Sequence, residues 1–373
     1  MASESARDYL NKHGVEDAVA KAVARVVREK PADPILAIAN LLASAGAMSE
    51  PPPFSLPAIV DPHHHFLAVD EPFHAFLKGL GAPSYTAAQY TADSAGVPIR
   101  ATVHVEAIPD EPLGEVNFVE KLAAAGECKV GTIVAACNLA DDDAAAQLDA
   151  LCAASPRVKG IRYILDYEGP FNKGENATHV ACSRHGLDYL RDPVASAAFE
   201  RGFAALGAKG LSFDLQCAPV QLPAAAALCA KHPSVKVCID HMGKPRNLAG
   251  DGGAADAAKL DEWRAGMALM AAQPQVCVKL SMLGFAVPGW CAAPKKAAFL
   301  KSLVRETISL FGAKRCMFCS NWHINGAVSD SDGGAEGPDI PALYAHFESW
   351  VSDLSLEEKT ALFEATAAAF YRC

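Results

Sequence analysis

Eight short, apolar, β-rich runs recur along the chain, and each is followed by a longer alanine-rich stretch that is typical of a helix. The runs are Ala58–Pro62, Arg100–Glu106, Val130–Cys137, Val158–Ile164, Leu211–Cys217, Val235–His241, Val276–Met282 and Arg315–Ser320. Buried strands that alternate with helices indicate a parallel sheet. Eight such units, spread over the chain from residue 58 to residue 373, favour a closed (β/α)8 TIM barrel over an open sheet.

The first 48 residues predict a separate, small helical module. Small apolar residues recur there at helical spacing: Val15, Ala18, Val19, Ala22, Val23, Val26 and Val27. After the break Pro31-Ala-Asp-Pro34 a second apolar helix begins, with Asp33 as its expected N-cap and Pro34 at its first position. A hairpin this short cannot bury both apolar stripes alone, so it should pack on a copy of itself, on the barrel or on a partner. We therefore expect a hairpin over 1–48, a stiff proline-rich linker over 49–57 and the barrel over 58–373.

This hairpin resembles the dimerisation/docking hairpin of protein kinase A regulatory subunits and their relatives. The resemblance rests on Tyr9-Leu10, on the apolar first helix and on the segment from Lys30 to Ile35. It implies a homodimer, or a hairpin that grips an amphipathic helix of a partner. An ordinary helical extension that covers the barrel explains the same pattern equally well.

Composition narrows the class of partner. The chain has 43 acidic and 33 basic residues and a formal net charge of −10, which disfavours nucleic acid and anionic membranes because both need clustered lysine and arginine. A small-molecule substrate is the remaining expectation. The N-terminus lacks the apolar core of a secretory signal, and no apolar stretch approaches the ~20 residues that span a bilayer. The cytoplasm is the expected compartment, in agreement with cysteines that are scattered in apolar runs as small hydrophobes.

The first predicted strand ends in a histidine-rich motif, Asp61-Pro-His63-His64-His65. Alternate residues of an extended chain share a face, so His63 and His65 can point into one cavity while His64 points away. Two imidazoles placed in this way predict a metal clamp. By itself the motif is weak evidence, because histidine-rich turns also occur for other reasons.

Polar and titratable residues also lie at the ends of most other predicted strands. They are His104 and Glu106 at the second, Arg162 in the fourth, Asp214 and Gln216 in the fifth, Asp240, His241 and Lys244 after the sixth, Lys279 and Ser281 in the seventh, and Ser320, Asn321, Trp322 and His323 after the eighth. Any one of them could be an ordinary cap or a satisfied polar group. Parallel barrels carry their active sites at the C-terminal ends of the strands, so the coincidence predicts one shared cavity.

These motifs resemble those of the amidohydrolase-2 branch of the metal-dependent hydrolases. The resemblance rests on Val60-Asp-Pro-His-His-His65-Phe66, Gly160-Ile-Arg162, Leu211-Ser-Phe-Asp214-Leu215, Ile239-Asp-His241-Met-Gly-Lys-Pro245, Val278-Lys-Leu-Ser281 and Arg315-Cys-Met-Phe-Cys-Ser320, which follow the expected order over nearly all of residues 58–373. That branch resembles lactonases, including sugar-acid lactonases and 2-pyrone-4,6-dicarboxylate lactonase. The resemblance implies hydrolysis of a cyclic ester with one divalent, zinc-like ion or with none.

The resemblance also implies roles for individual residues. His63, His65 and His241 would bind the metal ion or polarise the substrate carbonyl. The residues expected to contact a small carboxylated or sugar-acid substrate are Arg162, Lys244, Lys279, Trp322 and His323.

One position departs from the family pattern. Active lactonases usually end the eighth strand in Gly-Ser-Asp-Trp-Pro, where the aspartate is a general base or a metal ligand, whereas this chain has Cys319-Ser-Asn321-Trp-His323. Asparagine cannot accept a proton from water near neutral pH, and loss of a positioned base typically costs ~10²–10⁴-fold in rate.

Three interpretations of this substitution stay open. Another base can serve, among Glu106, Asp214 and His323, with Asp61 less favoured because it lies two residues before His63. The Asn321 amide can instead donate a hydrogen bond to a substrate oxygen. In the third interpretation the barrel is silent and binds a ligand or scaffolds a partner through its hairpin. We expect a hydrolase, because the histidine pair and the basic groups are intact. In this hypothesis the histidine cluster polarises a lactone carbonyl, and Glu106 or Asp214 deprotonates the attacking water.

Overall fold

The structure, a computed structural model, describes residues 15–29, 33–46, 54, 56, 58–172, 179–323 and 338–373. The chain forms two compact units that divide between Pro53 and Phe54. Most of the predicted linker, including Pro51–Pro53, lies outside the described residues, as do Tyr9-Leu10 and Lys30 of the hairpin motif. No described helix is both long enough and apolar enough to cross a bilayer.

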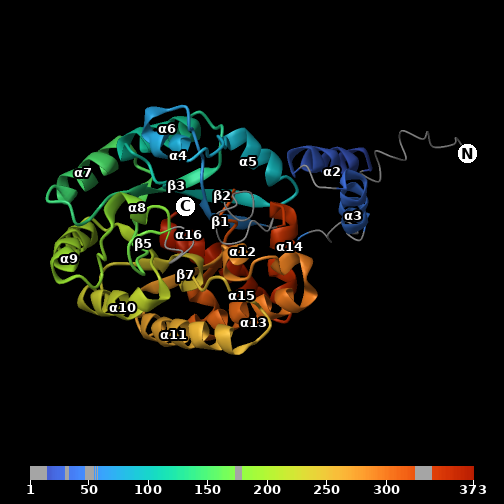
Figure 1. Cartoon of the computed structure of the whole chain (residues 1–373). Coiled ribbons are helices and arrows are strands. Elements are labelled where there is room, and N and C mark those ends of the chain that lie inside the picture. Colours follow the sequence, from blue (N-terminus) through green and yellow to red (C-terminus); the bar gives the residue numbers. More distant parts are fainter. Residues whose placement is uncertain are drawn as a thin grey trace, which may run out of the picture. The chain divides into compact units, whose positions relative to one another are not determined.

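The second unit is an eight-stranded parallel barrel (Figure 1). Its strands are β1 (Ile59–His64), β2 (Ile99–Val105), β3 (Val130–Ala136), β4 (Val158–Ile164), β5 (Ser212–Gln216), β6 (Val237–Ile239), β7 (Val276–Leu280) and β8 (Cys316–Phe318). They pair in chain order from β1 to β8. Beyond β8, the Asn321 amide donates to the His63 carbonyl at 2.8 Å and the His65 amide donates to the Trp322 carbonyl at 2.8 Å, which joins the last strand to the first. The predicted TIM barrel is confirmed.

Helices surround the strands as the outer layer (Figure 1). They are α4 (Ala75–Gly79), α5 (Ala87–Asp93), α6 (Pro112–Ala124), α7 (Ala144–Ala154), α8 (Cys182–His185), α9 (Pro193–Ala208), α10 (Leu222–Lys231), α11 (Ala254–Ala271), α12 (Leu283–Ala286), α13 (Pro294–Phe311), α14 (Ile340–Trp350), α15 (Leu356–Thr360) and α16 (Thr366–Tyr371). Local sequence starts several of them. Asp192 accepts hydrogen bonds from the first amides of α9, and Ser355 forms a capping box at α15.

Several strands end at other residues than the sequence predicts. β1 runs on to His64, whereas β6 ends at Ile239 and β8 at Phe318, before the predicted ends at His241 and Ser320. The residues just beyond β6, β7 and β8 adopt positive φ angles, among them His241 (56°), Met282 (57°) and Asn321 (51°). Such left-handed turns cannot continue a strand, and they redirect the side chains at the barrel mouth.

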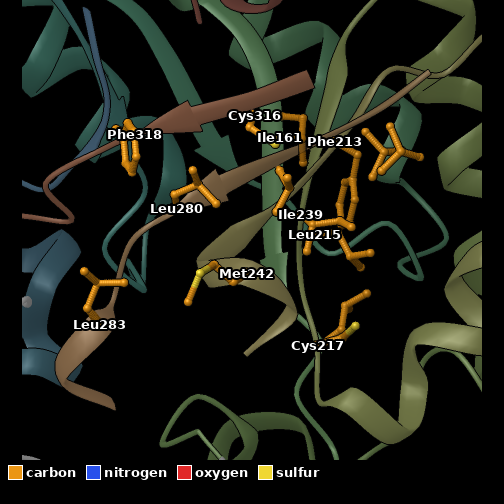
Figure 2. Close-up of a cluster of buried hydrophobic side chains, with 14 of the residues drawn as sticks. Ile161, Phe213, Leu215, Cys217, Ile239, Met242, Leu280, Leu283, Cys316 and Phe318 are labelled. Atoms are coloured by element: carbon orange, nitrogen blue, oxygen red, sulfur yellow. The ribbon is translucent and has the colours of Figure 1, made fainter. Parts of the chain in front are cut away.

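The main hydrophobic core lies between the strands and the helices. Side chains of neighbouring strands, such as Phe213, Ile239, Leu280 and Phe318, gather there (Figure 2). A second cluster fills the barrel interior, where Val60, Val103 and Val134 meet Phe370 and Tyr371 of α16. Thr132 Oγ1, near the start of β3, donates to the Tyr371 carbonyl at 2.8 Å. The C-terminal helix therefore covers the N-terminal end of the barrel, and its Tyr371 side chain reaches the interior.

No disulfide links the cysteines within the described residues. Cys316 and Cys319 have the spacing of a Cys-x-x-Cys pair, yet both are fully buried at β8. Burial raises the pKa of both thiols well above the ordinary value. These thiols act as small core residues rather than as a reactive pair.

The first unit is a hairpin of two helices, α2 (Val15–Glu29) and α3 (Pro34–Gly46). Asp33 caps α3, since its Oδ1 accepts a hydrogen bond from the Leu36 amide at 2.9 Å. Ala22 and Val26 of α2 are buried. A second row of valines on the same helix stays exposed: Val15, Val19, Val23 and Val27.

Candidate active site

Three imidazoles that are far apart in sequence meet at the C-terminal ends of the strands. The Nε2 atoms of His63 and His65 are 3.2 Å apart, and the ring centroids of His63 and His241 are 4.8 Å apart. His64, which lies between the first two in sequence, turns the other way and contacts Thr102 Oγ1 through Nε2 at 2.9 Å. The alternation of side chains along β1 therefore places His63 and His65 on one side and His64 on the other.

Neighbouring groups decide which histidine nitrogens carry a hydrogen. His65 Nδ1 donates to the Val105 carbonyl at 2.8 Å, so His65 Nε2 is an acceptor. His63 Nε2 then carries the hydrogen between the two rings, and His63 Nδ1 accepts from Lys279 Nζ at 3.3 Å. In this arrangement the 3.4 Å approach of Arg162 Nη1 to His63 Nε2 is a contact between two donors and not a hydrogen bond. Burial, the largest cause, lowers the pKa of both histidines, so both are neutral near pH 7.

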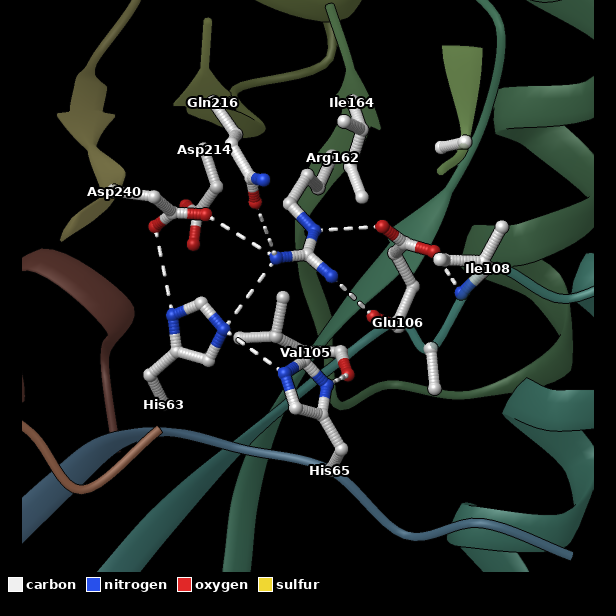
Figure 3. A network of polar contacts seen from close by, with 12 residues as sticks. His63, His65, Val105, Glu106, Ile108, Arg162, Ile164, Asp214, Gln216 and Asp240 are labelled. Carbon is white, nitrogen blue, oxygen red and sulfur yellow. Dashed lines mark hydrogen bonds and ion pairs between the residues drawn. The ribbon is translucent and has the colours of Figure 1, made fainter. Parts of the chain in front are cut away.

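A network of five buried charged residues surrounds the histidines, and we call it the charged centre: Glu106, Arg162, Asp214, Asp240 and Lys279. Figure 3 shows the first four of them beside His63 and His65. Arg162 Nε donates to Glu106 Oε1 at 2.6 Å, and Arg162 Nη1 lies 3.4 Å from Asp240 Oδ2. Lys279 Nζ pairs with Asp214 and lies 3.0 Å from Asp240 Oδ1. Each charge therefore has an opposite charge within reach, as buried ions require.

The two aspartates of the charged centre differ in acidity. Burial raises the pKa of Asp214 to about 6, although Lys279 and the Tyr371 hydroxyl, which donates to it at 2.8 Å, act in the opposite direction. Burial also opposes the charge of Asp240, but there Lys279 outweighs it and, with His63, holds the pKa well below the ordinary range. Asp240 is therefore the lasting anion next to His63 and His241.

The segment after β8 is held in place from β1 and α5. Asp61 accepts hydrogen bonds from the Ser320 amide at 2.9 Å and from the Tyr90 hydroxyl at 2.6 Å. These contacts fix the backbone on either side of Asn321. The Asn321 side chain is 1% exposed, and neither its Oδ1 nor its Nδ2 has a hydrogen-bond partner among the described residues. A buried amide with no partner is costly to the fold and is expected where a ligand binds.

A pocket of about 370 Å³ opens over this centre. Its described lining consists of His65, Leu67, Leu77, Leu80, Gly81, Ala82, Pro83, Ala107, Ile108, Arg162, Ile164, His179, Val180, Gln216, His241, Met282, Phe285 and Asn321. Four of the sequence-predicted site residues are among them: His65, Arg162, His241 and Asn321. The volume lies in the range of small-molecule sites, ~300–1,000 Å³.

The structure places the other predicted site residues away from this lining. Glu106 and Asp214, the expected bases, are bound to Arg162 and Lys279 respectively. Lys279 is 0% exposed, and Lys244 pairs with Asp166 at 2.7 Å. Both lysines, expected to hold the substrate, thus have carboxylate partners within the protein.

The two aromatic residues after Asn321 contact α5 and the loop before it. Trp322 Nε1 donates to Asp93 at 2.9 Å, and the His323 ring stacks on Tyr85 with a centroid distance of 4.5 Å. Neither lines the pocket, so the structure gives them neighbours other than the expected substrate.

A model of the amidohydrolase family matches residues 60–373. This range contains the C-terminal end of each of the eight strands. The chain belongs to the amidohydrolase family. The uncharacterised protein y4mH of Sinorhizobium fredii is 27% identical over 330 residues, which cover 84% of this chain and 98% of that protein. The L-fucono-1,5-lactonase of Burkholderia multivorans is 32% identical over 186 residues, which cover 49% of this chain and 58% of the lactonase.

The fold is shared with solved structures. A crystal structure of an amidohydrolase from Burkholderia multivorans with bound zinc has a TM-score of 0.64 at 23% identity and covers 84% of this chain and 99% of that one. A crystal structure of a probable 2-pyrone-4,6-dicarboxylic acid hydrolase from Acinetobacter baumannii has a TM-score of 0.58 at 13% identity, with coverage of 84% and 99%. At these identities the likeness shows the barrel of this amidohydrolase and no more.

The donor set of this amidohydrolase fits a divalent metal ion. His63, Asp240 and His241 each offer a ligand atom, and these atoms lie within 4.8 Å of one another. His65 Nε2 lies 3.2 Å from His63 Nε2, close to the separation of two nitrogens that are each bound ~2.0–2.1 Å from one tetrahedral ion. Imidazoles bind metal ions in the neutral form. If His63 bound the ion through Nε2, its hydrogen would move to Nδ1, and Asp240 Oδ1, 3.6 Å away, could accept a hydrogen bond from it.

Sequence reasoning missed two groups of residues in this amidohydrolase. The sequence places Asp240 next to His241 without predicting a role for it, although an acidic side chain beside a histidine is a usable signal. Asp166, which pairs with Lys244, and Tyr371, which reaches Asp214 from the C-terminus, carry no motif. The loop residues that line most of the pocket look like any other core leucine or isoleucine in the sequence.

Proposed function

We propose that this amidohydrolase hydrolyses a lactone at the pocket over the histidine cluster. The observation that carries the proposal is that the pocket lining contains Asn321, whose side-chain amide has no described protein partner, together with the imidazole of His241. His241 Nδ1 contacts Ser281 Oγ at 2.9 Å, which leaves Nε2 for the pocket. A lactone carbonyl and an attacking water need one donor and one acceptor of this kind.

In the proposed reaction, Asn321 Nδ2 donates a hydrogen bond to the carbonyl oxygen. A water attacks the carbonyl carbon and gives its proton to His241 Nε2. The attack converts the carbonyl into a tetrahedral intermediate, whose oxyanion is held by the Asn321 amide. The intermediate then collapses, the bond to the ring oxygen breaks, and His241 returns the proton to that oxygen, so the product is a hydroxy acid. Burial lowers the pKa of His241 to about 3, so it starts as the neutral base, and Asp240 beside it stabilises the imidazolium.

A divalent ion held by His63, Asp240 and His241 would occupy His241 Nε2, and it would then supply the polarisation of the carbonyl and the water of lowered pKa in place of that nitrogen. The charged centre has a different role. Arg162 and Lys279 are paired with carboxylates of the protein and keep Asp240 and His63 in position. They orient the histidines and leave the direct contacts with the ester to Asn321 and His241.

Hydrolysis of a panel of lactones, measured by pH-stat titration of the acid released, tests the proposal. The full-length protein is compared with two variants of Asn321. Because the amide acts as the oxyanion donor, Asn321→Ala and Asn321→Asp should each lower kcat by about 10²–10³-fold. An Asn321→Asp variant that is faster than the wild type would instead mean that the chain lacks a base at this position. Absence of turnover of every lactone would leave a silent barrel.

We further propose that the hairpin joins two copies of the chain. The exposed row Val15, Val19, Val23 and Val27 follows every fourth residue of α2, and such a stripe can be buried by a symmetric copy of itself. Deletion of residues 1–50 should turn a dimer into a monomer in light scattering and leave kcat/KM unchanged. A full-length chain that is monomeric at all concentrations contradicts this proposal.

A further inference from the structure

The wall of the pocket is apolar, in contrast to the charged centre beneath the histidines. We define the apolar wall as Leu67, Leu77, Leu80, Ile108, Met282 and Phe285. Its members come from separate segments: the loop after β1, α4 and the turn that follows it, the loop after β2, and α12 with the residue before it. Ala82, Pro83, Ala107, Ile164 and Val180 extend the same surface. Four segments of the chain thus present the hydrocarbon of the apolar wall to one cavity.

The polar groups of the lining have little hydrogen-bonding capacity left for a ligand. Arg162 donates to the Glu106 side chain and carbonyl, and to Gln216 Oε1 at 3.3 Å. Gln216 Nε2 in turn donates to Asp166 at 3.0 Å. His179 accepts a hydrogen bond from the Ala181 amide through Nδ1 at 3.1 Å, which leaves its Nε2. The Asn321 amide, His241 Nε2 and His179 Nε2 remain, and they suffice for one carbonyl and one water.

The described lining also offers no free cation to a carboxylate. Arg162 is its only Lys or Arg side chain, and it is already within ion-pair distance of Glu106 and Asp240. A carboxylate on the substrate would have to compete with these protein carboxylates for the same guanidinium. A ligand that fits the described residues is therefore neutral.

From this we infer the substrate class: a neutral lactone whose ring carries an apolar, alkyl or aryl, substituent, with the ester at Asn321 and His241 and the substituent against the apolar wall. This inference rests on the proposed lactone hydrolysis. A polyhydroxylated sugar lactone is disfavoured, because its hydroxyls would be buried against leucine, isoleucine and phenylalanine without partners. This inference differs from the expectation of a carboxylated or sugar-acid substrate, and the first test below compares a sugar lactone with apolar ones.

The first test compares kcat/KM for δ-valerolactone, δ-octalactone and glucono-1,5-lactone, with the uncatalysed hydrolysis subtracted. Each methylene of the octalactone tail that enters the wall should raise kcat/KM about 4-fold, so δ-octalactone should exceed δ-valerolactone at least ~10-fold. Glucono-1,5-lactone should fall below δ-valerolactone by ~10-fold or more, since each unpaired hydroxyl is costly. The reverse order, with the sugar lactone preferred, overturns the inference while it leaves lactone hydrolysis intact.

A variant of the wall sharpens the test. Leu80 is 53% exposed at the pocket, so Leu80→Asn should fold normally and should reduce the ratio of δ-octalactone to δ-valerolactone kcat/KM by ~3–10-fold. Leu269→Asn is the matched control, since Leu269 is 48% exposed on α11 and does not line the pocket. An unchanged ratio in Leu80→Asn contradicts the placement of the substituent.

Binding of inert analogues separates the two proposals if no lactone turns over. Piperidin-2-one and its 6-propyl derivative carry the same ring with an amide in place of the ester, and calorimetry measures their Kd. Binding of the propyl compound at least ~10-fold more tightly supports the apolar wall even where hydrolysis fails. Equal Kd values, or binding of neither compound, overturn the inference.

Discussion

The charged centre and the apolar wall lie within one site but follow opposite rules. In the centre, Arg162 and Lys279 face three carboxylates, and every charge has a partner from another strand. In the wall and at its edge, Leu80 is exposed and the Asn321 amide has no described partner. This difference shows that the charged residues of the site are not the ones available to contact a ligand. The centre maintains geometry, and the groups left unpaired next to hydrocarbon are free for the substrate.

Removing a charge from the centre should have the largest effect on stability. Lys279→Met leaves Asp214 and Asp240 without their lysine in a fully buried position, and it should lower the free energy of unfolding by about 3–5 kcal/mol. Urea denaturation followed by circular dichroism measures it. The double variant Lys279→Met/Asp214→Leu should recover part of the loss because one orphaned carboxylate is removed. A loss below about 1 kcal/mol in Lys279→Met would contradict the pairing.

Glu115 of α6 is a buried carboxylate outside the barrel interior, and it tests at acid pH whether buried charge pairs stabilise the fold. Burial opposes the charge of Glu115, but the imidazoles of His104 and His74 outweigh it and lower its pKa from 4.5 to about 2. Because the folded pKa is below the unfolded one, the stabilisation is complete above pH 4.5 and is lost as the pH falls towards 2. The wild type should lose about 3 kcal/mol more than Glu115→Gln over that window. Parallel pH profiles of stability would contradict the assignment.

The unpaired amide should behave in the opposite way to Lys279. Asn321→Leu removes a buried polar group without a described partner, and this gain offsets the cost of about 1 kcal/mol of placing leucine at a φ of 51°. The free energy of unfolding should therefore stay within about 1 kcal/mol of the wild type. Lactone hydrolysis should fall at the same time. Denaturation and kinetics on the same preparation check both statements. A loss of several kcal/mol would mean that the amide has a structural partner.

The barrel itself was predictable because buried parallel strands are near-continuous apolar runs, and Val158–Ile164 matches β4 residue for residue. The residues at which the strands end were harder to predict. Val235–His241 was predicted where β6 covers only Val237–Ile239, since the left-handed turn at His241 and Met242 has no glycine to signal it.

The chemistry of the site was predictable in part. The spacing of His63 and His65 on one strand followed from the period of two, and His241 from the matching strand end. The ion-pair partners of Arg162, Lys244 and Lys279 were not predictable. Glu106, Asp166 and Asp240 lie just beyond the ends of other strands, and the pairing depends on how neighbouring strand ends are aligned. Basic residues that a sequence offers to a substrate were thus already bound within the protein.

The most direct measurement is kcat/KM for δ-octalactone in the wild type, in His241→Asn and in His346→Asn. His346 is an imidazole of α14 that packs between Trp290 and Trp350, away from the pocket, and serves as the control. We predict turnover by the wild type and by His346→Asn, and a loss of ~10²–10⁴-fold in His241→Asn with unchanged folding. Turnover by His241→Asn at the wild-type rate, or by none of the three proteins, would contradict lactone hydrolysis at this pocket.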